Sequence, residues 1–517
     1  MPEEDPRILE LRATRDKAKL GGGVDRIARQ HAKGKLTARE RLELLLDPAS
    51  FQELEPFARQ EHNPLETKDE KYLGDGVVTG FGTIDGRTVY AYAQDFTVQG
   101  GSLGNMQGRK ICKAMDLAAQ TGSPIIGLID SGGARIQEGV YALGGYGEIF
   151  RRNAQYSGII PQISVIMGPC AGGASYSPAL TDLIVMVDKQ AFMFLTGPEV
   201  IKTVIGEVID QESLGGADAH LSISGTAHFK AADDRDAIQL VRTILSYLPS
   251  NNVENPPVVE TGDDPERMDG ALNSLVPLDP AEPYSMHTVI EHIVDRGTFL
   301  ELQATWARNA IIGLARMGGM PVGIVSQEPA MLAGVMDIDS ADKICRFVHM
   351  CDCFNVPLVT FVDSPGFLPG SDQEHRGIIR HGAKVLYAYS NASVPKISII
   401  TRKAYGGAMI VMSSKMLGAD IAYAWPSAEI AVMGPEGAAS ILFRKQIDSA
   451  PDPAAERNRV IDDYRQRFLN PYAAAAADYI DDVIEPRETR SRVIHALIAL
   501  RDKSVPGLPR KHGNWPV

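Results

Sequence analysis

One stretch occurs twice in the chain, and its repetition is the main guide to the fold. GRKICKAMDLAAQTGSPIIGLIDSGG occupies residues 108–133, and ADKICRFVHMCDCFNVPLVTFVDSPG occupies residues 341–366. The residues that match at a spacing of 233 are Gln94 with Gln327, Lys110 with Lys343, Cys112 with Cys345, Asp130 with Asp363, and Gly133 with Gly366. The sequence Gly-Gly-Ala at 172–174 returns at 406–408, with a spacing of 234. A spacing this constant over about 80 residues indicates an internal duplication.

Each copy alternates strand-like and helix-like segments. Residues 124–130 (PIIGLID) and 357–363 (PLVTFVD) are short apolar runs that open with Pro and close with Asp, as buried parallel strands do. The segments before them, 108–122 and 339–355, space their apolar residues as helices do. Strands that alternate with helices predict an α/β fold built from βαβ units.

Three further segments flank the copies. Residues 248–272 are rich in Pro, Asn and acidic side chains, as expected of a linker between the copies. A charged helical arm is predicted at 7–46, with a break at the three glycines 21–23 and a capping box at 37–40 (TARE). We expect this arm to pack on the body or to dock a subunit. A helical tail is predicted from about Asp452 onwards.

Composition limits the partners of the chain. Its 517 residues are 44% hydrophobic and 23% charged, as in an ordinary globular protein. The net charge of −13 argues against a nucleic acid or an anionic membrane as a general partner, although local sites for an anionic ligand remain open. The first residues, MPEEDPRILEL, show no signal peptide, and the apolar runs are too short to span a membrane. We therefore expect a cytoplasmic protein that does not insert into a membrane.

The cysteines, histidines and acidic pairs predict no metal site. Five cysteines form no even framework, which favours reduced thiols, and Cys351 and Cys353 are interpreted as a buried or half-buried pair on a helix. The histidines lack the spacing of a zinc site. The acidic pairs at 233–234 and 462–463 are interpreted as solvated surface.

Glycine-rich loops are expected at the ends of corresponding strands in both copies. They read DSGGAR (130–135) and CAGGAS (170–175) in the first copy, and DSPGFL (363–368) and AYGGAM (404–409) in the second. Glycine lets a ligand approach the backbone, and the free N–H groups at a helix start favour negative charge. Two such amides aimed at one oxygen form an oxyanion hole, in which one donor contributes about 3 kcal/mol. The alternative is that the glycines only allow helix to pack on strand.

Longer motifs resemble one enzyme family over nearly the whole chain. These motifs are SGGARIQEGV (131–140), GPCAGGASYSPALTD (168–182), FLTGPEVIK (194–202), RKAYGGA (402–408), YAWPSAEIAVMGPEGAA (423–439) and KHGN (511–514). They resemble the carboxyltransferase subunits of biotin-dependent acyl-CoA carboxylases, of the propionyl-CoA carboxylase β type. The resemblance implies two tandem crotonase-like domains, each a ββα superhelix. Residues 1–258 would form the acyl-CoA side with the N-terminal arm, and 262–508 the biotin side.

The resemblance also implies how the glycines act. One hole would hold the thioester enolate of the acyl-CoA, and the other the ureido oxygen of biotin. CO2 released from carboxybiotin would be captured by the enolate after the biotin anion has taken the α-proton. The residues that carry over are Gly133, Gly172, Gly173 and Ala174 for the first hole, and Gly366, Gly406, Gly407 and Ala408 for the second.

Two residues beside the holes are candidates for substrate binding. Arg135 is a candidate neighbour of CoA, and it could equally brace the loop through Asp130. Ile410 stands where propionyl-dedicated members of the family often have Asp, at a site associated with acyl-chain choice. The resemblance therefore implies propionyl-CoA or acetyl-CoA as substrate.

Two motifs that the sequence does not contain indicate that the chain works with partner chains. No Met-Lys-Met biotinylation site and no Gly-rich ATP-binding segment occur in it. Biotin, as carboxybiotin, is therefore expected on a partner, a biotin carboxylase or biotin carrier subunit. The resemblance implies a homohexamer built as a dimer of trimers, because the family places its site between two subunits.

Three alternatives stay open at this point. The chain could be the carboxyltransferase of a methylmalonyl-CoA decarboxylase or of transcarboxylase, which run the same chemistry in another direction. It could be a biotin-independent crotonase-type hydratase or thioesterase, for which Glu138 is the only close acid–base candidate in the first copy. A non-enzymatic scaffold would leave the paired glycine loops without a role.

Overall fold

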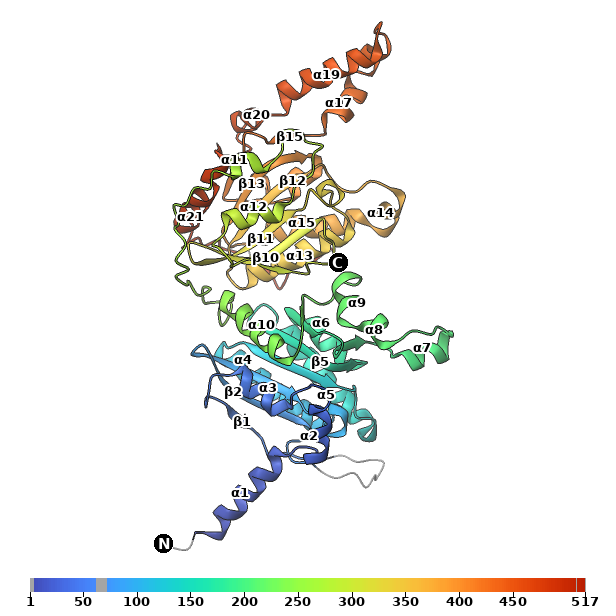
Figure 1. Ribbon diagram of the computed structural model, residues 1–517, viewed down its shortest axis with the longest axis vertical. Helices are drawn as coiled ribbons and strands as arrows, with labels where there is room; N and C mark the ends of the chain where they lie inside the picture. Colours follow the sequence, from blue (N-terminus) through green and yellow to red (C-terminus); the bar gives the residue numbers. More distant parts are fainter. Residues whose placement is uncertain (1–3, 62–71, 508, 517) are drawn as a thin grey trace. The chain divides into compact units, whose positions relative to one another are not determined.

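The computed structural model describes residues 4–61, 72–507 and 509–516. Contacts divide the chain into two compact units, Met1–Asn255 (unit 1) and Pro256–Val517 (unit 2), and the division falls within the stretch 248–272 (Figure 1). Each unit contains a sheet of its own.

The sheet of unit 1 begins with an antiparallel hairpin and continues with parallel strands. Its strands are β1 (Gln52–Leu54), β2 (Val77–Ile84), β3 (Arg87–Gln94), β4 (Ile125–Ser131), β5 (Gln162–Ala171), β6 (Leu183–Val187) and β8 (Phe229–Ala231), in that order, with β7 (Phe192–Phe194) paired to the far end of β5. Asp85 and Gly86 connect β2 to β3 and both have positive φ, which suits the tight turn of a hairpin. Strand β4 was predicted from the apolar run 124–130, whereas the hairpin strand β2 was not predicted.

The sheet of unit 2 repeats this order. Its strands are β9 (Leu300–Leu302), β10 (Ala310–Met317), β11 (Met320–Gln327), β12 (Leu358–Ser364), β13 (Lys396–Tyr405), β14 (Ile421–Ala424) and β16 (Asp482–Val483), with β15 (Glu429–Ala431) paired to the far end of β13. Gly318 and Gly319, both at positive φ, make the hairpin turn. The two units thus share one topology, which confirms the internal duplication.

Helices cover the parallel strands in each unit. In unit 1, α4 (Asn105–Thr121) packs on α5 (Val140–Tyr156), and α4 ends at Gly122 in the left-handed conformation. In unit 2, α13 (Ile338–Cys353) packs on α15 (Ile378–Asn391), so both predicted helix segments are confirmed. Cys351 is buried and Cys353 half-buried on α13, which agrees with their interpretation as a pair on a helix.

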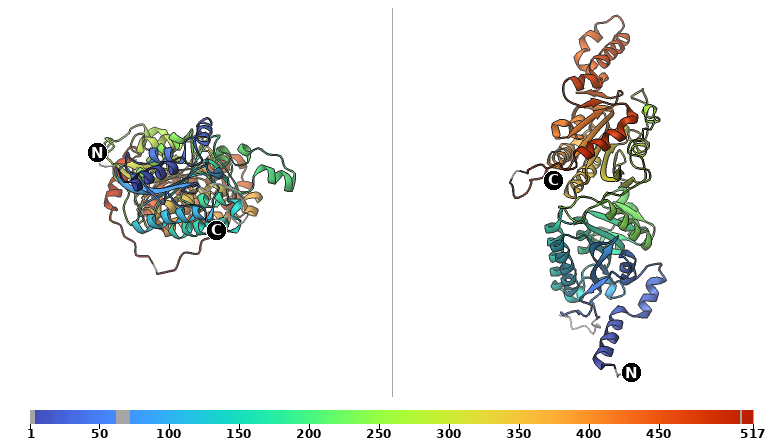
Figure 2. Two further views of the ribbon diagram at one scale, coloured as in Figure 1. Left: turned by 90° about the horizontal axis from the view of Figure 1, so that it is seen from below. Right: turned by 90° about the vertical axis from the view of Figure 1, so that its left-hand side faces the viewer.

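The N-terminal arm consists of α1 (Pro6–Lys19), α2 (Val24–His31) and α3 (Ala38–Leu45). Thr37 and Glu40 form the predicted capping box at the start of α3. Helix α1 projects from unit 1 and touches it near its C-terminal end, where Arg39 donates to the Ala18 carbonyl, whereas α3 contacts β3 and α10 (Asp234–Tyr247) (Figures 1 and 2). The part of the arm that includes α3 is therefore built into unit 1.

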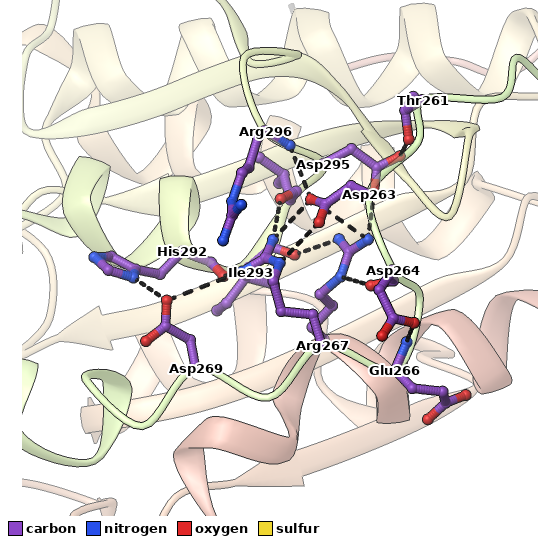
Figure 3. A network of polar contacts seen from close by, with 12 residues as sticks. Thr261, Asp263, Asp264, Glu266, Arg267, Asp269, His292, Ile293, Asp295 and Arg296 are labelled. Carbon is purple, nitrogen blue, oxygen red and sulfur yellow. Dashed lines mark hydrogen bonds and ion pairs between the residues drawn. The ribbon is translucent and has the colours of Figure 1, made fainter.

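A buried ion network fastens the start of unit 2 to its C-terminal helix, α21 (Thr489–Ala499) (Figure 3). Arg490 on α21 lies 2.7 Å from Asp295, and both side chains are almost fully buried. Asp295 also accepts hydrogen bonds from Thr261 and from the hairpin amides of Gly318 and Gly319. Arg267 joins the network through Asp263, so residues 261–267 are held on the body of unit 2.

The predicted helical tail is present in unit 2. It contains α19 (Pro453–Phe468) and α20 (Pro471–Ala476) before α21, and α17 (Pro435–Leu442) packs against α19. Near the C-terminus, the Trp515 ring lies 3.7 Å, centroid to centroid, from the ring of His349 on α13. Of the helices that the structure describes, none combines the length and the apolarity needed to cross a bilayer.

Candidate active site

Pairs of glycine loops meet at one edge of each sheet. In unit 1, β4 and β5 run parallel and Ser131 lies beside Cys170, so the loop after β4 and the turn after β5 are neighbours. In unit 2, Ser364 on β12 lies beside Ala404 on β13 in the same way. The pairing therefore brings together the predicted loops of each hole within one unit.

The turn after β5 requires glycine and opens a helix. Gly172 has φ 62° and ψ −129°, a conformation that residues with a Cβ rarely adopt, and its N–H donates to the Phe194 carbonyl at 2.9 Å. Gly173 and Ala174 are the first residues of α6 (Gly173–Leu180), where amides have no acceptor within the helix. Among the described residues, no side chain accepts from these two amides. Gly172 thus shapes the turn, and the next two residues present their N–H groups.

Tyr146 on α5 closes one side of this turn. A Cβ on Gly173 would lie 3.3 Å from the Tyr146 ring, which is tighter than ordinary contact. The Tyr146 side chain is buried, and this burial raises the pKa of its phenol. The ring therefore stays neutral and offers an apolar wall beside the amides.

The loops after β4 and β12 share a second feature. Gly133 has φ 102°, and its N–H donates to Ser131 Oγ at 3.2 Å. Gly366 has φ 140°, and its N–H donates to Ser364 Oγ at 3.3 Å. Both glycines thus lie in the left-handed region of φ, and each is held by the serine that ends its strand.

Unit 2 has the matching turn after β13. Gly406, at φ 56°, opens the short helix α16 (Gly406–Val411), and Gly407 and Ala408 follow. A Cβ on Gly407 would meet the Phe367 ring at 3.6 Å, an ordinary contact. Ile410 lies on the same helix with its side chain partly exposed. The structure therefore brings Ile410 next to the predicted hole of unit 2.

A buried aspartate lies at the base of each pair of loops. Asp130, at the end of β4, is fully buried with Lys35 Nζ at 2.6 Å and Arg41 Nη1 at 3.0 Å. Asp363, at the end of β12, is fully buried with Arg402 Nε at 3.0 Å. Burial lowers the pKa of Lys35, and the Asp130 carboxylate opposes that effect. Neither these cations nor the serines were predicted from the sequence, although the repeated Asp-Ser at 130–131 and 363–364 was a signal for the serines.

The interpretation of Asp234 as solvated surface was wrong. Asp234 is almost fully buried, and Arg41 Nε lies 2.8 Å from its carboxylate. A charge run is usually solvated, but here the N-terminal arm covers it. Asp233 beside it caps α10 by accepting from the amides of Arg235 and Asp236.

Arg135 does not brace its loop through Asp130. Its buried guanidinium lies 2.6 Å from Asp75 and 2.8 Å from Glu138, and it donates to the Ser102 carbonyl. The structure thus places it inside unit 1, among carboxylates, rather than at a surface that could receive CoA phosphates. Glu138 is fully buried in the same cluster and accepts from the Asn105 amide at 2.7 Å, so it is not free to act as an acid or base.

The fold and the site define a class of protein: a duplicated α/β protein in which each copy has a glycine turn at the start of a helix. A family model described as the carboxyl transferase domain matches residues 29–515. The chain belongs to the carboxyl transferase family.

Three relatives specify this further. The chain is 55% identical over 517 residues to the propionyl-CoA carboxylase, carboxyltransferase subunit, of Haloferax mediterranei, with 100% of both chains covered. It is 53% identical over 511 residues to the methylmalonyl-CoA decarboxylase subunit alpha of Propionigenium modestum, with 99% of each covered. The crystal structure of transcarboxylase 12S superposes with a TM-score of 0.97 at 49% identity, covering 100% of this chain and 99% of that one.

These comparisons confirm the resemblance and the fold class, two tandem crotonase-like domains. The chain is a carboxyltransferase enzyme, and the alternative of a biotin-independent hydratase or thioesterase is not favoured. The buried ion pair of Glu138 gives the physical reason, because that alternative depends on a free acid–base side chain.

Proposed function

We propose that this chain is the carboxyltransferase component of a biotin-dependent acyl-CoA carboxylase. It moves CO2 from carboxybiotin, held on a partner chain, to the α-carbon of a short acyl-CoA. The observation that carries the proposal is the pair of equivalent glycine turns, at Gly172–Ala174 and Gly406–Ala408, each opening a helix at the edge of its own sheet. Carboxybiotin supplies the CO2, and the chain supplies fixed amides where charge develops.

In unit 1, the amides of Gly173 and Ala174 stabilise the thioester oxygen as the substrate becomes an enolate. They lie at a helix start, where the aligned peptide dipoles add to the attraction for negative charge. Gly172 contributes the turn, and Gly133 places the neighbouring loop close to it, since a Cβ there would lie 2.8 Å from the Ala171 carbonyl. Fixed dipoles need no reorganisation during the reaction, which is why side-chain chemistry is not required.

In unit 2, the residues fit the ureido oxygen of biotin. A Cβ on Gly366 would meet no atom within 4 Å, so the backbone there is open to a ligand. Gly407 and Ala408 follow Gly406 at the start of α16 and present their amides as in unit 1. These residues, with Gly366 and Gly406, would hold the oxygen and stabilise the charge that appears on it.

The acyl group is proposed to be propionyl, with acetyl as the second choice. Ile410 offers an apolar and partly exposed side chain on α16, which suits a short alkyl chain. The relative from Haloferax mediterranei is named for propionyl-CoA, and the transcarboxylase structure is described with methylmalonyl-CoA bound.

The proposed assembly is a homohexamer, a dimer of trimers, that works with a biotin carboxylase or biotin carrier subunit. The transcarboxylase 12S structure is described as a hexamer, and its chain resembles this one over the full length. The second candidate function, decarboxylation of methylmalonyl-CoA within a larger complex, is supported by the relative from Propionigenium modestum.

The test uses the purified hexamer with methylmalonyl-CoA or malonyl-CoA, with and without free biotin. We expect loss of the carboxyl group only when biotin is present, and faster with methylmalonyl-CoA. Decarboxylation without biotin would overturn the two-hole mechanism. A preference for malonyl-CoA would overturn the propionyl assignment but leave carboxyl transfer intact. Purification of the chain together with its native partners then distinguishes between the two candidate functions, because the identity of the partners shows whether the complex is a carboxylase or a decarboxylase.

A further inference from the structure

The buried aspartate of unit 2 is neutralised by its own sheet. Arg402 on β13 lies 3.0 Å from Asp363 and also donates to the carbonyls of Asp279 and Glu282. The amide of Lys403 donates to the same carboxylate at 3.1 Å. One strand therefore supplies both the cation and the turn at Gly406.

Unit 1 lacks this cation on its own strand. The residue that matches Arg402 is Gly168 on β5, at the same spacing of 234 that relates Gly172 to Gly406. A Cβ on Gly168 would collide with Asp130 Oδ1 and would lie 2.6 Å from Lys35 Nζ. The space that a side chain would need at Gly168 is thus taken by Asp130 and by a cation from another segment.

That segment is the N-terminal arm. Lys35 precedes α3 and lies 2.6 Å from Asp130, and Arg41 on α3 bridges Asp130 at 3.0 Å and Asp234 at 2.8 Å. Arg41 also donates to the Met167 carbonyl at 3.3 Å, so it joins the ends of β4 and β5. These are the two strands whose loops form the proposed acyl-CoA hole.

The arm is also anchored on its N-terminal side. The amide of Gly22 donates to Thr97 Oγ1 at 3.0 Å, and Arg26 donates to the Thr97 carbonyl at 3.0 Å. A Cβ on Gly22 would collide with that carbonyl, which explains why this part of the arm is glycine. The arm is thus attached to unit 1 at Thr97 as well as at Asp130.

We propose that Lys35 and Arg41 are positioning residues for the acyl-CoA half of the reaction, an inference that rests on the proposed function. They fix Asp130, whose chain continues through Ser131 into the loop that carries Gly133. The arm thus provides the cations that pair with the buried aspartate of unit 1, as β13 provides the cation that pairs with the buried aspartate of unit 2. Removing one of the two cations leaves a buried negative charge on Asp130 and Asp234 without its partner. The end of β4 is then free to move.

The test compares Lys35→Met with Lys35→Arg in the assembled hexamer, using biotin-dependent decarboxylation of methylmalonyl-CoA. Methionine keeps the length of the side chain and removes its charge, while Arg41 still partners Asp130. For Lys35→Met we expect kcat to fall by about tenfold, with the KM for free biotin unchanged within about twofold, because a hole that is displaced loses transition-state stabilisation. Lys35→Arg should keep more than about half of kcat, since the cation is restored.

Arg402→Met is the matched control in unit 2. Because it disturbs the base of the proposed biotin hole, we expect it to raise the KM for free biotin, while the affinity for methylmalonyl-CoA, measured by calorimetry, stays the same. Hexamer size and thermal melting check that each variant is folded.

The outcomes separate the two proposals. A wild-type hexamer without biotin-dependent activity overturns the proposed function and this inference with it. An active wild type with unchanged kcat in Lys35→Met overturns only the inference. If Lys35→Met weakens the use of free biotin as much as the use of methylmalonyl-CoA, or if Lys35→Arg does not restore kcat, Lys35 has a general structural role. Either result also overturns the inference.

Discussion

The guanidinium of Arg135 lies 2.6 Å from the carboxylate of Asp75, and both side chains are buried. This pair connects the loop that follows β4 to the segment that precedes β2. Glu138 completes the cluster at 2.8 Å from the same guanidinium. Arg135, which the sequence offered as a neighbour of CoA or as a brace of its loop through Asp130, is therefore part of the interior of unit 1 and pairs with other carboxylates.

Arg135→Met is expected to destabilise the protein. It leaves two carboxylates buried without their cation, which costs about 3 kcal/mol or more of unfolding free energy. Urea unfolding should show this loss. Arg151→Met is the control, because Arg151 is exposed and pairs with exposed Glu148, so its loss should stay below about 1 kcal/mol. Equal effects of the two changes would contradict the buried role of Arg135.

Gly407→Ala should remove activity without unfolding the protein. The new Cβ would meet Phe367 at 3.6 Å, an ordinary contact, but it would stand where a ligand has to approach the backbone. We expect kcat/KM for free biotin to fall by about 100-fold, the effect of a lost oxyanion contact.

Gly147→Ala is the matched control for that change. Gly147 lies within α5, and a Cβ there would meet nothing within 4 Å, so alanine should leave kcat unchanged and stabilise the helix slightly. If Gly407→Ala retained wild-type kcat/KM, the amides of α16 would not hold a ligand.

His287 makes the stability of unit 2 depend on pH. Its ring lies 3.0 Å from Glu301 and 2.9 Å from Glu328, and these hydrogen bonds, that of Glu301 first, raise the pKa of His287 to about 9. A raised pKa stabilises the folded state fully below the unfolded value of about 6.5, and this contribution disappears as the pH rises to about 9.

The measurement is the difference in melting temperature between wild type and His287→Gln. It should be largest near pH 6 and should vanish as the pH rises through about 9. Because the ring is partly exposed, the difference will be small. A difference that grew with pH would refute the assignment.

Asp295→Asn should loosen two segments together. Asp295 accepts from the amides of Gly318 at 3.0 Å and Gly319 at 2.7 Å, and it pairs with Arg490 at 2.7 Å. Loss of the charge weakens all three contacts, so hydrogen exchange should accelerate in the β10–β11 turn and in α21. Exchange in α4 of unit 1 serves as the internal reference and should not change.

Much of the fold was predictable from local sequence. The fixed spacing between copies predicted the duplication, and the apolar runs predicted β4 and β12 because fully buried strands need uninterrupted apolar residues. Thr37 and Glu40 predicted the start of α3 because a capping box acts over three residues. The hairpin partners β2 and β10 were missed, although their turns carry the Asp-Gly and Gly-Gly signals.

Local sequence indicated where backbone amides could be open to a ligand, because a turn with positive φ favours glycine and the glycines are visible in the sequence. The folded chain, in contrast, shows which amides already have an acceptor, as at Gly172, and which charges are buried together. Asp130 meets Lys35 and Arg41 across about 90 residues of chain, and the nearness of such groups depends on how strands and arm pack. The backbone conformation of a turn can be predicted from neighbouring residues in the sequence. The pairing of buried charges cannot, because it depends on contacts that form only in the folded chain.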